Sequence, residues 1–385
     1  MRKLVYLDTY STHHMHEMFN ASSLVMFSHL YDRVDYYASY SSIYNVKKII
    51  GTLPANIYIH SIYIVNTQKH FGKIRRFLKQ IQATLLNVYF IRYVNYNDDI
   101  VINYMTAISL YPINIITNYC KRRVLIVCHS DIQEVLGKHK VSYLFKKSIR
   151  MLTNRNVKIA SSLWFAVLSE SILINVKGIV SNQVKEKLVF FDHTAIFQYS
   201  DKIEEDKHNS ILKLGYIGEL RQSKGADTFL TLAKKFRHNP HVEFRIIGST
   251  KGKRVILEEA GVIIPNGVGD DFISRELMYS LIKELDYVIY CFPPEDYKYT
   301  ASGSIFDAID CERPIIAIKN DYFDGLFNSY GHFGFLAQNE KEIAQIIASL
   351  LKNPNMIKWD IKAIKQSLSP LNAAKRFSSS KWFTD

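Results

Sequence analysis

Short apolar segments recur through the second half of the chain, and longer segments with helical spacing separate most of them. Strands are predicted at Leu212–Ile217, Val242–Ile247, Val262–Ile264, Tyr287–Phe292, Pro314–Ile318 and Phe333–Leu336. Helices are predicted at Asp227–Phe236, Ile273–Leu285 and Glu340–Leu351. Strands that alternate with helices are typical of an α/β domain in which helices cover both faces of a parallel sheet.

The first half shows the same alternation with less regular spacing. Strands are predicted at Lys3–Asp8, Val34–Ala38, Ile57–Val65, Val88–Val94, Asp99–Asn103, Arg123–Cys128 and Trp164–Leu168. Helices are predicted within His14–Leu30, Phe71–Leu86 and Ile132–Thr153. We therefore expect a second parallel sheet in this half.

A length of 385 residues exceeds what one hydrophobic core usually organises, so two domains are expected. The polar segment Gln198–Ser210 is interpreted as the linker between them. The predicted domains are 1–195 and 211–355, followed by a helical and basic tail at 356–385.

A first candidate site follows the predicted strand Tyr287–Phe292. Ser302, Gly303 and Ser304 open a helix whose first turn carries Asp307. Free N–H groups at a helix start attract phosphate, and a carboxylate one turn later can accept hydrogen bonds from ribose hydroxyls. This arrangement indicates a nucleotide-sugar site. Simple capping fits the same residues, with Ser304 as the N-cap of a capping box that ends at Asp307.

A second candidate site follows the predicted strand Leu212–Ile217. Gly215 and Gly218 suggest a close approach of the backbone, and Lys224 stands just before the next helix. A lysine there can reach a diphosphate as a flexible point charge. The alternative is a solvated surface lysine.

Together the two segments resemble the C-terminal half of retaining glycosyltransferases of the GT-B fold, and most closely family 4. The segment Leu212–Phe229 is similar to that family's strand, Gly-Arg loop, Lys-Gly and helix. The stretch Asp307-Ala-Ile-Asp-Cys-Glu-Arg-Pro-Ile-Ile-Ala317 resembles the end of its Glu-x7-Glu motif. The resemblance extends over about Leu212 to Asn353 and is only schematic before that.

The resemblance implies two facing Rossmann-like domains, a C-terminal helix that crosses back to the first domain, and sugar transfer with retention. Residues expected to bind the donor are Gly218, Arg221, Lys224, Ser302, Gly303, Ser304 and Asp307. The sequence departs from the family at three positions. Glu219 replaces the loop arginine, for which Arg221 is the expected substitute; Tyr299 replaces the first glutamate, and Asp307 shortens the second.

The strand predicted at Arg123–Cys128 ends in polar residues and resembles the family strand that ends in a histidine near the donor sugar. His129 is therefore the candidate catalytic residue, with a structural histidine as the alternative. His13, His14 and His16 have a spacing that suggests metal, but no acidic partners accompany them. Because Asp-x-Asp is absent from the sequence, we expect transfer without a metal ion or other cofactor.

Positive charge gathers in the first half, where residues 1–188 carry 24 Lys and Arg against 10 Asp and Glu. The rest contributes about −1 to the total of +13. The densest stretch, Lys138–Lys158, mixes Lys138, Lys140, Lys146, Lys147, Arg150, Arg155 and Lys158 with apolar residues. This pattern suits a helix on an anionic membrane. A solvated face, a nucleic-acid site and recognition of an anionic acceptor remain alternatives.

No stretch of 18 apolar residues is present, and the apolar run before Asp8 is too short for a signal peptide. The four cysteines, Cys120, Cys128, Cys291 and Cys311, lack metal-ligand spacing. Nothing in the basic half resembles a zinc finger, an RNP-type motif or a helix-turn-helix, so no nucleic-acid partner is expected. We expect a cytoplasmic protein that attaches peripherally to the inner face of the cell membrane.

The sequence therefore predicts a glycosyltransferase that moves a sugar from a nucleotide diphosphate to a lipid-linked or growing bacterial surface glycan. Two alternatives belong to other classes. A nucleotide-sugar epimerase can share the fold, and a basic nucleic-acid-binding protein would account for the charge.

Overall fold

The computed structural model describes residues 2–65, 72–106, 108–129, 132–133, 148–197, 211–271, 273–353 and 357–384. The chain divides into two compact units. Unit 1 comprises residues 1–196, 299–301 and 368–385, and unit 2 comprises residues 197–298 and 302–367. The expected linker Gln198–Ser210 lies outside the described residues.

Unit 1 contains a parallel sheet of seven strands in the order β3-β2-β1-β4-β5-β6-β7. Its strands are β1 (Lys3–Leu7), β2 (Arg33–Ala38), β3 (Ile57–Ser61), β4 (Asp99–Ile102), β5 (Val124–Val127), β6 (Leu163–Val167) and β7 (Leu188–Phe190). Its helices are α1 (Glu17–Ser28), α2 (Tyr40–Ile50), α3 (Gly72–Tyr93), α4 (Leu110–Cys120), η2 (Arg150–Leu152), α6 (Glu170–Lys177), α7 (Asn182–Glu186), α15 (Pro370–Ser378) and α16 (Lys381–Thr384).

Unit 2 contains a parallel sheet of six strands in the order β10-β9-β8-β11-β12-β13. Its strands are β8 (Leu212–Ile217), β9 (Val242–Ile247), β10 (Val262–Ile263), β11 (Tyr287–Tyr290), β12 (Ile315–Ile318) and β13 (Gly334–Ala337). Its helices are η3 (Gln222–Lys224), α8 (Ala226–Phe236), α9 (Arg254–Glu259), α10 (Arg275–Lys283), η4 (Pro294–Tyr297), α11 (Ser304–Asp310), α12 (Asp321–Tyr330), α13 (Glu340–Lys352) and α14 (Ile361–Ser367).

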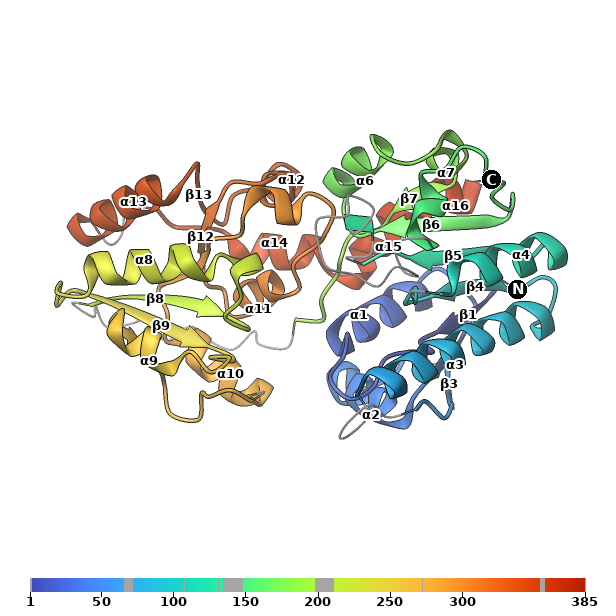
Figure 1. Cartoon of the computed structure of the whole chain (residues 1–385), viewed down its shortest axis with the longest axis horizontal. Helices are drawn as coiled ribbons and strands as arrows, with labels where there is room; N and C mark the ends of the chain where they lie inside the picture. Colours follow the sequence, from blue (N-terminus) through green and yellow to red (C-terminus); the bar gives the residue numbers. More distant parts are fainter. Residues whose placement is uncertain are drawn as a thin grey trace. The chain divides into compact units, whose positions relative to one another are not determined.

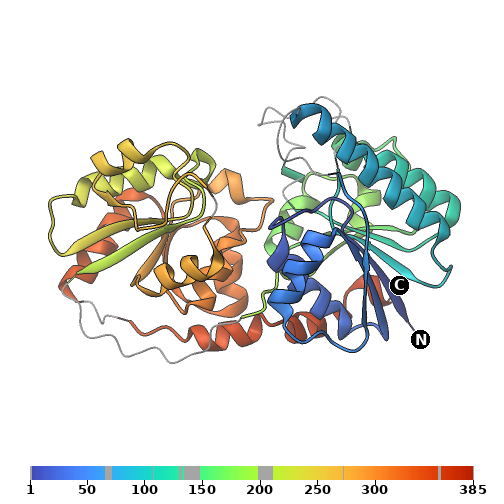
Figure 2. The same cartoon turned by 90° about the horizontal axis from the view of Figure 1, so that it is seen from below.

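Helices lie on both faces of each sheet (Figures 1 and 2), which confirms the predicted α/β class. The central strands are apolar throughout because no side of them meets water; all four residues of β5, for example, are fully buried. The strands of unit 2 lie close to their predicted bounds. Strands β8 and β9 begin and end at the predicted residues.

One strand prediction is wrong. Val88–Val94 forms the end of the 22-residue helix α3 and its C-terminal flank, not a strand. Its β-branched and aromatic residues suit a strand locally, yet burial recurs at Ala83, Asn87 and Ile91, four residues apart. Packing of this helical face therefore overrides local propensity. The short strand β7 and the helices α2, α4, α6 and α7 were not predicted.

The C-terminal helices α15 and α16 pack within unit 1. Trp382 is fully buried and donates a hydrogen bond from Nε1 to the Tyr31 hydroxyl at 3.0 Å. The Phe377 ring lies 5.3 Å from the Phe191 ring. The predicted basic tail is thus divided, because α14 belongs to unit 2. None of the described helices has the length and apolar character needed to cross a membrane.

The strand order of each sheet reverses at one point, between β1 and β4 in unit 1 and between β8 and β11 in unit 2. In parallel α/β sheets, ligands bind beyond the carboxyl ends of the strands at such a switch point. The loops after β1, β4, β8 and β11 are therefore the places to look for a site.

A substitution in the loop after β8 tests how closely these loops pack. Gly225 has φ +71°, and a Cβ atom there would lie 1.8 Å from the carbonyl oxygen of Cys291, just after β11. Gly51 has nearly the same φ, +72°, but open space around it. Gly225→Ala should lower the free energy of unfolding by about 1–3 kcal/mol more than Gly51→Ala, because only Gly225 adds a clash to the backbone strain. Urea unfolding of the two variants measures this difference, and equal losses would contradict the close packing.

Candidate functional site

The loop between β8 and α8 turns sharply at Gly218. This residue has φ +100°, a conformation that favours glycine. The Tyr216 hydroxyl donates to the Glu219 carbonyl at 3.0 Å and lies 3.5 Å from the Arg221 amide. The buried Tyr216 ring therefore fixes the backbone of residues 219–221. The loop ends at Gly225, against the end of β11.

The Lys224 side chain returns over this turn. A Cβ atom at Gly218 would lie 3.3 Å from Lys224 Nζ, so the ammonium group stands directly above the glycine. Burial lowers the pKa of Lys224, Arg221 lowers it further, and the charges of Glu219 and Asp307 oppose the shift. Within the described residues, Lys224 Nζ has neither a hydrogen bond nor an ion pair. A half-buried ammonium without a close counter-ion is a natural position for a bound anion.

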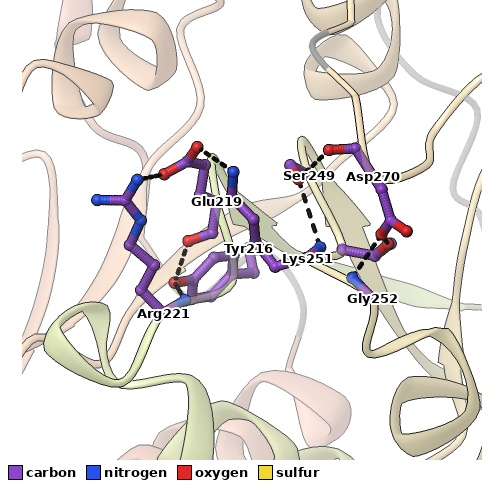
Figure 3. A network of polar contacts seen from close by, with 8 residues as sticks. Tyr216, Glu219, Arg221, Ser249, Lys251, Gly252 and Asp270 are labelled. Atoms are coloured by element: carbon purple, nitrogen blue, oxygen red, sulfur yellow. Dashed lines mark hydrogen bonds and ion pairs between the residues drawn. The ribbon is translucent and has the colours of Figure 1, made fainter. Parts of the chain in front are cut away.

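Glu219 holds two further cations, Arg221 and Lys251 (Figure 3). Its Oε2 pairs with Arg221, and its Oε1 lies 2.7 Å from Lys251 Nζ. Burial tends to raise the pKa of Glu219, but the hydrogen bond from Lys251 and the charge of Arg221 lower it overall. The carboxylate that departs from the family pattern thus holds two basic side chains in place.

Lys251 comes from the loop after β9, which Asp270 stabilises (Figure 3). The Gly252 amide donates to Asp270 Oδ1 at 2.6 Å, and the Ser249 hydroxyl donates to the Asp270 carbonyl at 2.7 Å. The Lys251 amide donates in turn to the Ser249 hydroxyl at 3.3 Å. These bonds hold Lys251 at φ +53°, a strained value for a non-glycine residue.

Asp307 lies on α11 and faces α10. Its Oδ1 accepts hydrogen bonds from Arg275 Nη2 at 2.9 Å and from the Tyr279 hydroxyl at 3.4 Å. Burial raises the pKa of Asp307 to about 6, against the opposing charges of Arg275 and Lys224. In the described part of the chain, no residue hydrogen-bonds to the second oxygen, Oδ2. Asp307 is thus coupled to Lys224 while one of its oxygens remains available.

Ser302, Gly303 and Ser304 precede and begin α11. Gly303 is the N-cap and makes no side-chain capping bond, and the Ser304 hydroxyl lies 3.2 Å from that of Ser302. The capping-box alternative is therefore wrong, because Ser304 is already helical and Asp307 binds Arg275. Gly303 is exposed, with no atom within 4 Å of the position where its Cβ would stand. The backbone is open to a ligand at this point.

In unit 1, His129 follows β5 at the carboxyl edge of the sheet. Its Nε2 donates to the Asn103 carbonyl at 2.9 Å, so in the neutral ring the Nδ1 atom is an acceptor. Asn103 also donates to Asn20, which donates to Asp8 Oδ2 at 2.6 Å. This chain of bonds joins the loops after β1, β4 and β5.

Three imidazoles gather around Phe19 at this edge. The His129 ring lies 4.4 Å from the His16 ring and 4.8 Å from Phe19, and Phe19 lies 5.1 Å from His193. Burial lowers the pKa of His16 and of His193 to about 4, and that of His129 falls well below its ordinary value for the same reason. All three rings are therefore neutral near pH 7.

The three histidines after β1 make different contacts. His14 Nδ1 lies 2.8 Å from Glu17 Oε2, the His13 amide donates to the Ser41 hydroxyl, and His16 joins the buried cluster. Among the described residues, no group of three His, Cys, Asp or Glu side chains is arranged to hold a metal ion.

Several residues of the two sets were not predicted, namely Lys251, Arg275 and Tyr279 in unit 2 and His193 in unit 1. Lys251 had a sequence signal, because Gly248-Ser-Thr-Lys-Gly252 follows a predicted strand as the Gly218 loop does. Arg275 and Tyr279 are spaced as one face of a helix, but nothing in that spacing indicates Asp307. Tyr299, at the position of the family glutamate, is 5% exposed.

About half of the predicted basic segment Lys138–Lys158 lies outside the described residues. Residues 134–147, which include Lys138, Lys140, Lys146 and Lys147, are not described. In the remainder, Ile149, Met151 and Leu152 are each 1% exposed and pack into unit 1.

The pKa of Asp307 predicts a pH dependence of stability. Because its folded-state pKa of about 6 exceeds the usual value near 4, the protonated form favours folding. This contribution is complete well below pH 4 and is lost as the pH rises through 6. Relative to Asp307→Asn, the free energy of unfolding of the unchanged protein should therefore fall by about 2 kcal/mol between pH 4 and 7. Urea unfolding across this range measures it, and a constant difference would contradict the raised pKa.

No protein-family model matches the chain, and no curated protein sequence matches it. Among solved structures, HepE of Anabaena in complex with UDP aligns over 98% of this chain and 98% of its own, with a TM-score of 0.63 and 13% identity. A glycosyltransferase of Rickettsia africae aligns over 99% and 97%, with a TM-score of 0.61 and 13% identity. TarM of S. aureus aligns over 79% of this chain and 59% of its own, with a TM-score of 0.57 and 17% identity. At these identities the likeness shows the fold, which is the GT-B fold of two Rossmann-like domains.

Proposed function

We propose that this protein is a glycosyltransferase that takes a sugar from a nucleotide diphosphate donor bound by unit 2. The observation that carries the proposal is the Lys224 ammonium, which stands over the Gly218 turn at a topological switch point without a close counter-ion. Solved structures of the same fold, including HepE, contain UDP or UDP-glucose. Because a fold alone does not determine an activity, the proposal rests on the residues of this site as well as on the fold.

The residues of unit 2 suit a leaving diphosphate. Negative charge accumulates on the diphosphate as the bond to the sugar breaks, and fixed cations stabilise that charge in the transition state. Lys224 is nearest the turn, while Arg221 and Lys251 are held beside it by Glu219. Gly218 and Gly303 leave room for phosphate oxygens to approach the backbone, with Ser302 and Ser304 beside Gly303.

Asp307 is the proposed partner of the donor ribose. Arg275 fixes the carboxylate through Oδ1, which leaves Oδ2 to accept a hydrogen bond from a ribose hydroxyl. Lys224 lies within electrostatic range of the same carboxylate. Asp307 and Lys224 would therefore bind the ribose and the diphosphate of the same nucleotide.

His129 is the proposed catalytic residue of unit 1. Asn103 fixes its tautomer, and burial keeps its ring neutral, so Nδ1 can accept a hydrogen bond from a sugar hydroxyl. By resemblance to family 4, the transfer would retain the anomeric configuration, with the departing phosphate taking the acceptor proton.

The acceptor we propose is a lipid-linked or growing bacterial surface glycan. The excess of positive charge in residues 1–188 supports an anionic membrane as the place of work, with the protein attached to its inner face. Polysaccharide biosynthesis is the corresponding process.

Two substitutions with opposite expected effects on nucleotide affinity test the donor site. Lys224→Ala should weaken binding of UDP or GDP by about 1–3 kcal/mol, because a charged hydrogen bond is lost. Glu219→Gln should strengthen it several-fold, because removal of a carboxylate leaves Arg221 and Lys251 free to face the phosphates. Isothermal titration calorimetry measures both affinities.

Lys235→Ala is the matched control, since Lys235 is an exposed lysine on α8 in the same unit. It should leave the affinity unchanged. Unaltered binding in both Lys224→Ala and Glu219→Gln would rule out this loop as the diphosphate site, provided that thermal melts show all variants folded.

Metal independence gives a further prediction, based on the absence of Asp-x-Asp and on the three cations near Gly218. Release of nucleoside diphosphate from a nucleotide sugar, with membrane extract as acceptor, should survive excess EDTA. Loss of release that Mn²⁺ or Mg²⁺ restores would contradict the proposal. Analysis of the products without acceptor distinguishes a glycosyltransferase from an epimerase. An epimerase would interconvert nucleotide sugars and release no diphosphate.

A further inference from the structure

Helix α3 exposes an apolar stripe along its whole length. Its members follow helical spacing on the face opposite Ala83, Asn87 and Ile91, which are buried. The stripe consists of Ile74 (62% exposed), Leu78 (49%), Leu85 (64%), Tyr89 (56%) and Tyr93 (66%). Exposed apolar residues are common singly, but a continuous row of large ones marks an interaction surface.

Helix α4 packs beside α3 (Figures 1 and 2). It carries a second apolar stripe. Tyr111, Ile115 and Tyr119, four residues apart, are 37%, 67% and 71% exposed. Arg92 joins the two stripes, because its guanidinium lies 5.8 Å from the Tyr93 ring and 5.5 Å from the Tyr119 ring. The two rows therefore form one surface, which we name the α3–α4 face.

The charge of this face is entirely positive. Neither helix contains an aspartate or a glutamate. Arg75 and Arg92 are exposed, and helical spacing places both on the side of α3 that carries the stripe. Arg122, after α4, lies 5.0 Å from the ring of Tyr96, which is 68% exposed. The nearest acid along the chain, Asp98, follows α3 in the turn before β4.

This combination selects among the possible partners. A second copy of the chain would bring like charges together, which opposes self-association. Single-stranded nucleic acid would use the arginines and tyrosines but gains no stacking from Ile74, Leu78, Leu85 and Ile115. An anionic bilayer accommodates all of them, with the aliphatic side chains in the acyl boundary, tyrosines at the headgroups and arginines on lipid phosphates.

We propose that the α3–α4 face is a docking surface for an anionic membrane. The inference deepens the membrane partner of the proposed function and is independent of the donor site in unit 2. It places docking on described, exposed side chains, and so differs from the segment Lys138–Lys158 that the sequence suggested.

The experiment is sedimentation of the full chain with vesicles of phosphatidylcholine alone and of phosphatidylcholine with phosphatidylglycerol. The unchanged protein should bind the anionic vesicles, and binding should weaken with salt. The triple variant Leu85→Ser, Tyr89→Ser, Ile115→Ser should bind on the order of tenfold more weakly, because its apolar contact is lost. Arg75→Gln and Arg92→Gln should each weaken binding by about fivefold on anionic vesicles.

Ile174→Ser and Val255→Ser are the matched controls, because both residues are 65% exposed but lie on α6 and α9. They should bind vesicles like the unchanged protein. Thermal melts and UDP affinity confirm that every variant is folded.

Three results would overturn the inference. Unchanged vesicle binding in the triple variant would show that the α3–α4 face is not the docking surface. If a variant with Lys146→Gln, Lys147→Gln and Arg150→Gln then lost vesicle binding, the docking surface would be the segment Lys138–Lys158. No vesicle binding by the unchanged protein would remove the membrane partner, while UDP affinity would still report on the donor site. Tighter binding to a single-stranded oligonucleotide than to anionic vesicles, lost in the triple variant, would assign the face to nucleic acid.

Discussion

The contact between Gly225 and the carbonyl of Cys291 determines the geometry of the candidate donor site. It brings the loop after β8 against the end of β11 at the point where the strand order of the sheet reverses. A second contact of this kind lies beside it, since a Cβ at Gly248 would lie 2.3 Å from the Gly218 carbonyl. With both loops fixed by backbone contacts, Lys224 starts from a fixed backbone position immediately before Gly225. From that position its ammonium group extends over Gly218.

Carboxylates beside a phosphate site require an explanation, because each would repel the ligand. Both carboxylates of this site are already paired: Glu219 with Arg221 and Lys251, and Asp307 with Arg275. Pairing reduces this repulsion and leaves a net positive cluster, since Lys224 adds its charge to the three paired cations. The loop that carries Glu219 also carries Arg221 and Lys224, so positive charge remains on the loop itself.

The sequence predicted the unit 2 sheet well because its strands are buried on both faces and separated by strongly amphipathic helices. It failed at Val88–Val94, where strand-forming residues complete a helix whose burial only tertiary packing reveals. Local motifs singled out Lys224 and Asp307 as candidates. Arg275 was missed because it joins Asp307 across about thirty residues that no local pattern records. Lys251 was missed although its loop, like the Gly218 loop, follows a predicted strand. The buried cluster of His16, His129 and His193 was missed as a cluster for the same reason.

Helix α3 links the two properties that we assign to unit 1. Its exposed face carries the apolar stripe, and its buried face reaches the loop after β1. The Lys79 ammonium, 3% exposed, donates to the Thr12 hydroxyl at 3.0 Å, and Asn87 Oδ1 accepts from the Thr9 hydroxyl at 3.0 Å. That loop continues to His16, whose ring lies against His129. A helix bound to a bilayer through one face would therefore hold, through the other, the loop beside the proposed catalytic histidine. This connection gives a physical reason for an acceptor that reaches the protein from the membrane.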